Sequence, residues 1–185
     1  MDDNITDKQL QKEMHKDFFV RCQNAINNGC YFEAMLMEYA AIEGRLEVIM
    51  GVLGLPCNKQ LPSEERRKIY VSNRLTCLRE IYLSSNVLAD SPIPRSFWKK
   101  LEKWIRSRNM YIHGLYKNEI QYKSRMKDVE SIAKAGYDYA NTLYKEAKRL
   151  RRLLRKGVLS ESSDIECNKS LCAFIRNKTD NSEQN

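Results

Sequence analysis

The chain has 185 residues and a formal net charge of +8, and it is long enough for one domain with a sizeable core and a tail. Seven glycines and four prolines are few for this length, which favours long helices over a strand-and-turn architecture. The longest apolar runs fall far short of the ~20 residues that cross a bilayer, and the acidic start does not resemble a secretory signal. We therefore expect a soluble, cytoplasmic protein.

Two amphipathic helices are predicted in the first third of the chain. The first is Asp7–Asn28, and Asn27-Asn28-Gly29 is a stop and turn signal. The second is Tyr31–Leu53, where the apolar residues from Met35 onward are spaced by four, three, four, three and four positions. That spacing is the period of a helix with one buried side.

Three further helices are predicted, at about Glu64–Leu83, Pro94–Gly114 and Lys123–Lys156. Ser63 is suited to cap the first of them, and the two acids that follow it suit the positive end of a helix. The last is the longest. Its apolar stripe continues through Gly136, although a glycine costs a helix about 1 kcal/mol relative to alanine.

Five amphipathic helices joined by mostly short loops indicate an all-α fold. We expect an up-and-down bundle of about five helices over residues 1–156. Residues 157–185 are rich in Ser, Asn, Asp and Glu, so a polar, flexible and largely disordered C-terminal tail is predicted there.

The segment Arg108-Asn109-Met110-Tyr111-Ile112-His113 holds the residues best suited to chemistry. In this segment a polar residue follows the arginine, and a histidine stands five positions after the arginine. This pattern resembles the signature of the HEPN superfamily of helical nucleotide-binding domains. The resemblance covers roughly residues 7–156, but only these six residues are specific. It implies a metal-independent endoribonuclease without a cofactor, acting as a toxin or defence effector.

The same residues suit cleavage of RNA by its own 2′-hydroxyl, which attacks the adjacent phosphate. His113 can act as general acid or base, because histidine titrates near neutral pH. Arg108 supplies a planar, permanently charged fork that matches phosphate oxygens. Asn109 can orient the imidazole or donate to the phosphate. The products are a 2′,3′-cyclic phosphate and a 5′-hydroxyl.

Helical geometry separates the two charged residues of this motif. Asn109 shares the face of His113, whereas Arg108 lies about 140° from His113 and near the apolar stripe of its helix. A straight helix therefore points Arg108 inward, unless the helix is distorted or the side chain reaches around. An acid of the second helix can also anchor it, and the candidates are Glu43 and Glu47.

Positive charge is concentrated in one third of the chain. Residues 94–156 carry 18 basic and 6 acidic side chains, a net of +12, which is expected of a surface for a polyanion. A solvated helix face is the alternative. RNA contacts are predicted for Arg106, Lys103, Arg149 and Arg152. Arg106 lies seven residues before His113 on the same face and is the alternative motif arginine; Arg108 is preferred because Asn109 follows it.

The resemblance also implies partners. Two protomers of HEPN proteins bring their motifs together, so a homodimer is expected. Toxins of this family that pair with a nucleotidyltransferase antitoxin usually have a tyrosine two residues after the histidine, but Leu115 stands there and Tyr116 follows. That departure disfavours this antitoxin and leaves another antitoxin or regulatory protein. The alternative function is a catalytically inactive HEPN-like module that binds nucleic acid or a protein.

Six cysteines and two histidines do not form a recognisable metal site. No Cys-x-x-Cys pair occurs, and a structural zinc site needs four ligands at characteristic spacing. We therefore predict no metal, and reduced thiols as in other cytosolic helical proteins.

Overall fold

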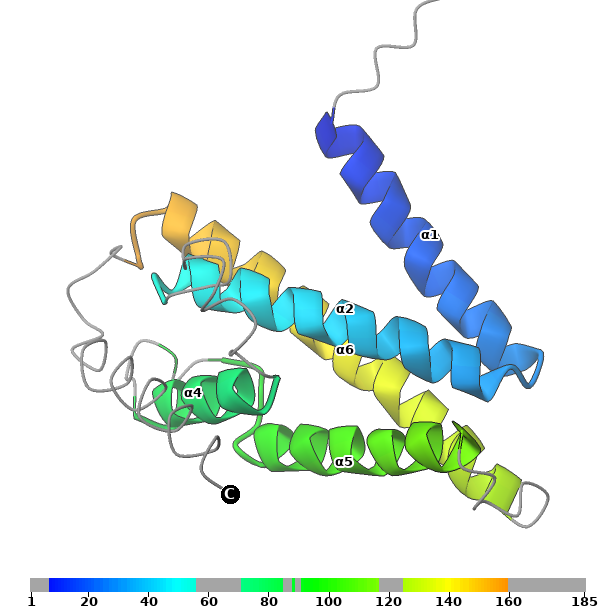
Figure 1. Cartoon of the computed structure of the whole chain (residues 1–185). Coiled ribbons are helices and arrows are strands. Elements are labelled where there is room, and N and C mark those ends of the chain that lie inside the picture. The colour runs from blue at the N-terminus through cyan, green and yellow to red at the C-terminus, as the bar shows by residue number, and fades with distance from the viewer. Residues whose placement is uncertain (1–6, 56–70, 85–87, 89–90, 117–124, 160–185) are drawn as a thin grey trace, which may run out of the picture. The chain divides into compact units, whose positions relative to one another are not determined.

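The computed structural model describes residues 7–55, 71–84, 88, 91–116 and 125–159, with side chains from residue 17 onward except at 84, 115 and 116. This part of the chain is all-α, as predicted, and contains five helices and no strand. The helices are α1 (Asp7–Asn27), α2 (Tyr31–Val52), α4 (Val71–Ser84), α5 (Ser96–Tyr116) and α6 (Met126–Arg155), as Figure 1 shows. None of them is long and apolar enough to span a bilayer.

Four of the predicted helices match α1, α2, α5 and α6 to within three residues at each end. The end predicted for the third helix, Leu83, is one residue short of the end of α4 at Ser84. The start predicted at Ser63-Glu64-Glu65 lies outside the described residues. The same holds for nearly all of the predicted tail, from residue 160 onward.

Glycines end three of the helices with the same backbone geometry. Gly29, Gly54 and Gly157 have φ angles of 75°, 69° and 69°, which other residues rarely adopt. After Gly29, the N–H of Cys30 donates to the carbonyl of Ala25 at 2.8 Å and pairs an oxygen that the end of α1 would leave unsatisfied. The stop signal predicted at Asn27-Asn28-Gly29 therefore acts through a left-handed glycine.

The described helices belong to two compact units. Among the described residues, unit 1 comprises those within 7–41 and 104–140, and unit 2 comprises those within 42–103 and 141–159. Each of the helices α2, α5 and α6 contributes one part to each unit, whereas α1 belongs to unit 1 and α4 to unit 2.

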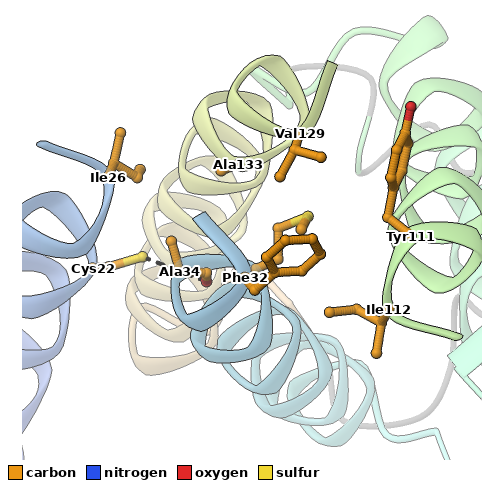
Figure 2. Packing of buried hydrophobic residues seen from close by; sticks show 9 residues of the cluster. Cys22, Ile26, Phe32, Ala34, Tyr111, Ile112, Val129 and Ala133 are labelled. Carbon is orange, nitrogen blue, oxygen red and sulfur yellow. Dashed lines mark hydrogen bonds between the residues drawn. The ribbon is translucent and has the colours of Figure 1, made fainter. Parts of the chain in front are cut away.

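The core of unit 1 joins four helices through aliphatic, sulfur-containing and aromatic side chains (Figure 2). Its members, all at most 9% exposed, are Cys22, Ile26, Phe32, Ala34, Met35, Tyr111, Ile112, Val129 and Ala133. In Figure 2 the ring of Phe32 lies on the side of α2 that faces Ile112 of α5. Burying one apolar side chain such as that of Phe32 or Ile112 stabilises the folded state by about 1.5–3 kcal/mol. Since Tyr111 and Ile112 belong to the motif, this core fixes the rotation of α5 there.

The core of unit 2 combines large aliphatic side chains with one buried polar network. The fully buried apolar members include Leu46, Leu78, Trp98, Leu101, Leu143 and Leu150. Oε1 of the buried Glu146 accepts hydrogen bonds from the hydroxyls of Tyr82 (2.7 Å) and Ser91 (3.0 Å). Arg149 donates to both carboxylate oxygens at 2.8 Å. Burial alone would raise the pKa of Glu146, but these hydrogen bonds outweigh it and hold the pKa below its ordinary value.

Candidate functional site

The motif lies in the last three turns of α5, which runs without interruption from Ser96 to Tyr116. A local distortion of the helix therefore does not redirect Arg108. The motif residues accordingly divide between an inner and an outer face at the angles that a regular helix gives them.

Arg108 is on the inner face and half-buried. Its guanidinium carbon lies 4.4 Å from the centroid of the Tyr39 ring on α2, a cation–π contact. Its Nη1 donates to Oδ1 of Asn109 at 2.9 Å, and its buried Nε has no hydrogen-bond partner. Burial lowers the pKa of Arg108, and the neighbouring Tyr39 opposes that effect. The sequence-based prediction that a straight helix points this arginine inward is confirmed.

Two acids were expected as anchors of Arg108, namely Glu43 and Glu47. In the structure Oε1 of Glu43 lies 3.7 Å from Nη1 of the buried Arg74. The groups that contact Arg108 are an aromatic ring and an amide oxygen. An ion pair from Arg108 to Glu43 or Glu47 stays a prediction.

The inner face of the motif is held by two further residues. Ile112 packs in the core of unit 1 (Figure 2). Tyr111 is also buried there, and its hydroxyl reaches Oδ2 of Asp128 on α6 and donates to it at 3.1 Å. Together with Arg108, these residues fix which side chains of α5 face solvent.

The outer face presents His113, which is exposed, together with the exposed Arg106 and Met110 and the half-buried Asn109. Arg106 lies about 20° from His113 around the helix and about 10 Å from it along the axis. Met110, between them, is 53% exposed. Of the two candidate motif arginines, Arg106 therefore shares the solvent-facing side of His113, and Arg108 does not.

Glu38 forms a buried polar group that the sequence analysis missed. Its carboxyl group is fully buried, Sγ of Cys22 lies 3.6 Å from its Oε1, and its Oε2 has no hydrogen-bond partner. Burial raises the pKa of Glu38 to about 8, despite hydrogen bonds from Cys22 and the Tyr137 backbone that lower it. Burial, with the nearby Glu38, raises the pKa of Cys22 to about 12. The sequence holds one indication of this buried group, which is the glycine inside the longest helix: a Cβ atom at Gly136 would overlap the carboxyl group of Glu38.

The other predicted RNA contacts differ in exposure. Lys103 and Arg152 are exposed, and Nε of Arg152 donates weakly to the Lys148 carbonyl at 3.4 Å. Arg149, by contrast, is 22% exposed and engaged with Glu146. Its side chain holds the core of unit 2 together.

The described residues contain no group of three or more His, Cys, Asp or Glu side chains placed to hold a metal ion. Within the described residues, Cys22, Cys30 and Cys77 form no disulfide, while Cys57, Cys167 and Cys172 lie outside them. The side chains of Leu115 and Tyr116 also lie outside them. Comparisons with protein-family models, curated proteins and solved structures found no significant match.

Proposed function

We propose that the protein is a metal-independent endoribonuclease of the HEPN type that acts in the cytoplasm as a toxin or defence effector. The observation that carries the proposal is the exposure of His113 on the same face of an unbroken helix as Arg106 and Asn109. A buried imidazole would have no access to a phosphodiester, whereas an exposed one on the same helix face as an arginine has the groups that this cleavage needs.

In this reaction the 2′-hydroxyl attacks the adjacent phosphorus, and the bond from phosphorus to the 5′-oxygen breaks. The proton of the 2′-hydroxyl passes to one imidazole, and a second imidazole protonates the leaving 5′-oxygen. The described residues include one histidine side chain, that of His113. A homodimer supplies the second imidazole as the partner's copy of the same residue.

The phosphate clamp is assigned to Arg106. The sequence favours Arg108 for this role, but that side chain is half-buried and stacks on Tyr39. Arg108 instead acts as a positioning residue through Asn109. Because Oδ1 of Asn109 accepts the hydrogen bond from Arg108, the amide nitrogen of Asn109 is the group left to donate to a phosphate oxygen.

The test is incubation of the purified full chain with single-stranded RNA in excess chelator. Wild-type protein should release products with a 2′,3′-cyclic phosphate. His113→Ala should lower the rate by at least about a hundredfold, the usual contribution of a general acid–base group. His15→Ala is the matched control, because His15 is the other histidine of the chain, and it should leave the rate unchanged.

A second pair of variants separates the arginines. Arg106→Ala should weaken both RNA binding and cleavage, and Lys99→Ala, an exposed cation earlier on α5, is its control. Arg108→Ala should lower the cleavage rate with less effect on binding. Cleavage that persists in His113→Ala would reject the proposal.

The alternative is a catalytically inactive HEPN-like module that binds nucleic acid or a protein. The inward position of Arg108 favours it, because the arginine of the motif then does not reach the phosphate beside His113. RNA binding without cleavage in the same assay would support this alternative. If the protein neither binds nor cleaves RNA, the module that binds a protein is the reading that remains.

A further inference from the structure

The last three turns of α6 carry a row of exposed positive charges. The row consists of Lys145, Lys148 and Arg152 on the helix and Lys156, which follows it directly. At about 100° per residue these four positions fall within about 80° of one another. Neighbours in the row lie one turn apart, so their side chains form a line along the helix.

This charge is not compensated by the acid nearest in sequence. Glu146 is the one acidic residue between positions 139 and 159. It is fully buried, and Arg149 already neutralises it. Within the described ranges, Lys145, Lys148 and Lys156 have no carboxylate partner.

Arg45 of α2 gives an independent sign that cations crowd this surface. It lies over the ring of Tyr144, with its guanidinium carbon 5.0 Å from the ring centroid. Burial lowers the pKa of Arg45, and the charge of Arg151 lowers it further. Two arginines of different helices are thus close enough to repel each other.

The attraction of the helix dipole for cations does not account for the whole row. That effect is confined to the last turn of a helix, whereas Lys145 and Lys148 come earlier. Like charges four residues apart, such as Lys148 and Arg152, also destabilise a helix. A bound polyanion relieves this repulsion, which a solvated face would retain.

The surroundings of the row favour a nucleic acid strand over a membrane. A helix that binds in a bilayer interface needs exposed apolar side chains to insert. The apolar side of this part of α6, made by Leu143, Ala147 and Leu150, is buried in unit 2. Side chains one turn apart have Cβ atoms about 5–6 Å apart, so the row presents closely spaced cations in a line, which suits the line of negative phosphates along a nucleic acid backbone.

We propose that Lys145, Lys148, Arg152 and Lys156 form a surface that binds the phosphate backbone of a single nucleic acid strand. Arg149, which the sequence included in the RNA-binding set, is not part of it, because its guanidinium holds Glu146. The inference rests on the proposed function only in taking RNA as the strand. It does not require that His113 cleave anything.

The test measures binding and not cleavage. Fluorescence anisotropy of labelled single-stranded polyuridylate is followed in full-chain His113→Ala protein over a range of salt concentrations. One variant adds Lys145→Gln, Lys148→Gln and Arg152→Gln. The matched control instead adds Arg95→Gln, Lys99→Gln and Lys100→Gln, three exposed cations of unit 2 that lie just before and at the start of α5, so both proteins lose the same net charge.

The α6 variant should bind at least about tenfold more weakly, with the slope of log Kd against log salt reduced by about 2, as expected for three lost contacts to a single strand. The control should change much less. A third variant with Lys145→Arg, Lys148→Arg and Arg152→Lys should bind as the parent does, and single-stranded DNA of equal length should bind comparably. All three proteins should keep their helical circular dichroism.

Three results would overturn the inference. One is an equal loss in both triple variants, which would mean that net charge alone matters. Another is unchanged binding in the α6 variant. The third is that the α6 variant keeps RNA binding but, unlike its parent, no longer binds vesicles of phosphatidylcholine and phosphatidylserine. That result would assign the surface to a membrane.

Discussion

Gly136 of α6 leaves the space that the carboxyl group of Glu38 occupies on α2. A Cβ atom built at position 136 would overlap Oε2 of Glu38 and the ring of Trp104. That ring is itself fixed, because its indole N–H donates to the carbonyl of Ile132 at 2.7 Å. Neither neighbour can retreat easily, so the absence of a side chain at 136 allows the helices of unit 1 to approach each other.

Gly136→Ala should therefore destabilise the protein. Alanine gains about 1 kcal/mol of helix propensity over glycine, but overpacking of a tight core typically costs about 1–3 kcal/mol, and here a buried carboxyl group is displaced as well. The free energy of unfolding, measured with urea, should fall. Gly44→Ala on α2 is the control, since nothing lies within 4 Å of a Cβ there; that change should leave stability unchanged or raise it. A stabilised Gly136→Ala protein would contradict the close approach.

Glu38 should make stability depend on pH. Burial raises its pKa from an ordinary 4.5 to about 8, so between these values the folded state binds one more proton than the unfolded state. The free energy of unfolding should fall as pH rises through this window, by about 1.4 kcal/mol per pH unit from this residue, and level off above it.

Glu38→Gln should remove this slope, because an amide does not titrate. The neighbouring titratable groups are Cys22 on α1, whose pKa of about 12 lies above the window, and Asp138 on α6. Urea unfolding at several pH values between 5 and 8 measures the effect. Equal slopes in wild type and variant would show that another group is responsible.

The helices were predictable from sequence because the apolar residues repeat with the helical period, and the glycine stops were predictable because few other residues adopt their backbone angle. The buried face of α6 in the structure includes Val129, Ala133 and Ala140, which are spaced by four and seven positions, as the helical period requires. The two-unit division was not predictable, since it depends on packing between helices distant in sequence.

At the site, helical geometry was enough to place Asn109 and His113 on one face and Arg108 on another. It did not identify Tyr39 as the partner of Arg108, because any aromatic or acidic residue of a facing helix could serve. Glu38 could not be distinguished in the sequence from a solvent-exposed acid, and Arg149 could not be distinguished from Arg152. In both cases the deciding contact comes from the folded arrangement of side chains.

The stacking of Arg108 on Tyr39 should be measurable as a coupling energy. Tyr39→Leu and Arg108→Ala are compared with the double variant in a double-mutant cycle of unfolding free energies. A cation–π contact at this depth should give a coupling of about 0.5–2 kcal/mol. A value near zero would mean that the two side chains act independently, and Arg108 would then have no fixed position from which to hold Asn109.

Arg149 and Arg152 should behave differently although both are basic residues of the same helix. Arg149→Ala leaves the buried charge of Glu146 without its ion pair, a loss that typically costs about 3–5 kcal/mol. Arg152→Ala changes an exposed side chain and should stay within about 0.5 kcal/mol. Thermal and urea unfolding measure both. In the Arg149 variant the pKa of Glu146 should rise from its lowered value, so the folded state takes up protons more readily and stability should fall less steeply as the solution is acidified. Equal stabilities of the two variants would contradict the structural role of Arg149.

Met110 offers a test of the homodimer that the proposed reaction requires. It is 53% exposed on the face of α5 that carries His113, so a second protomer that completes the site would cover it. Met110→Glu places a charge in that interface and should shift the protein from dimer to monomer in sedimentation velocity. RNA cleavage should then fall in proportion to the lost dimer and recover at high protein concentration. Met110→Leu should keep both dimer and activity.

The matched control is Leu83→Glu. Leu83 on α4 is 46% exposed and belongs to unit 2, so the same type of substitution is made outside the unit that carries the motif. It should leave the dimer intact. If wild-type protein sediments as a monomer while it cleaves RNA, the second imidazole does not come from a second protomer. If Leu83→Glu dissociates the dimer and Met110→Glu does not, the protomers associate elsewhere, and the exposed methionine beside His113 is then free to contact the bases of the RNA itself.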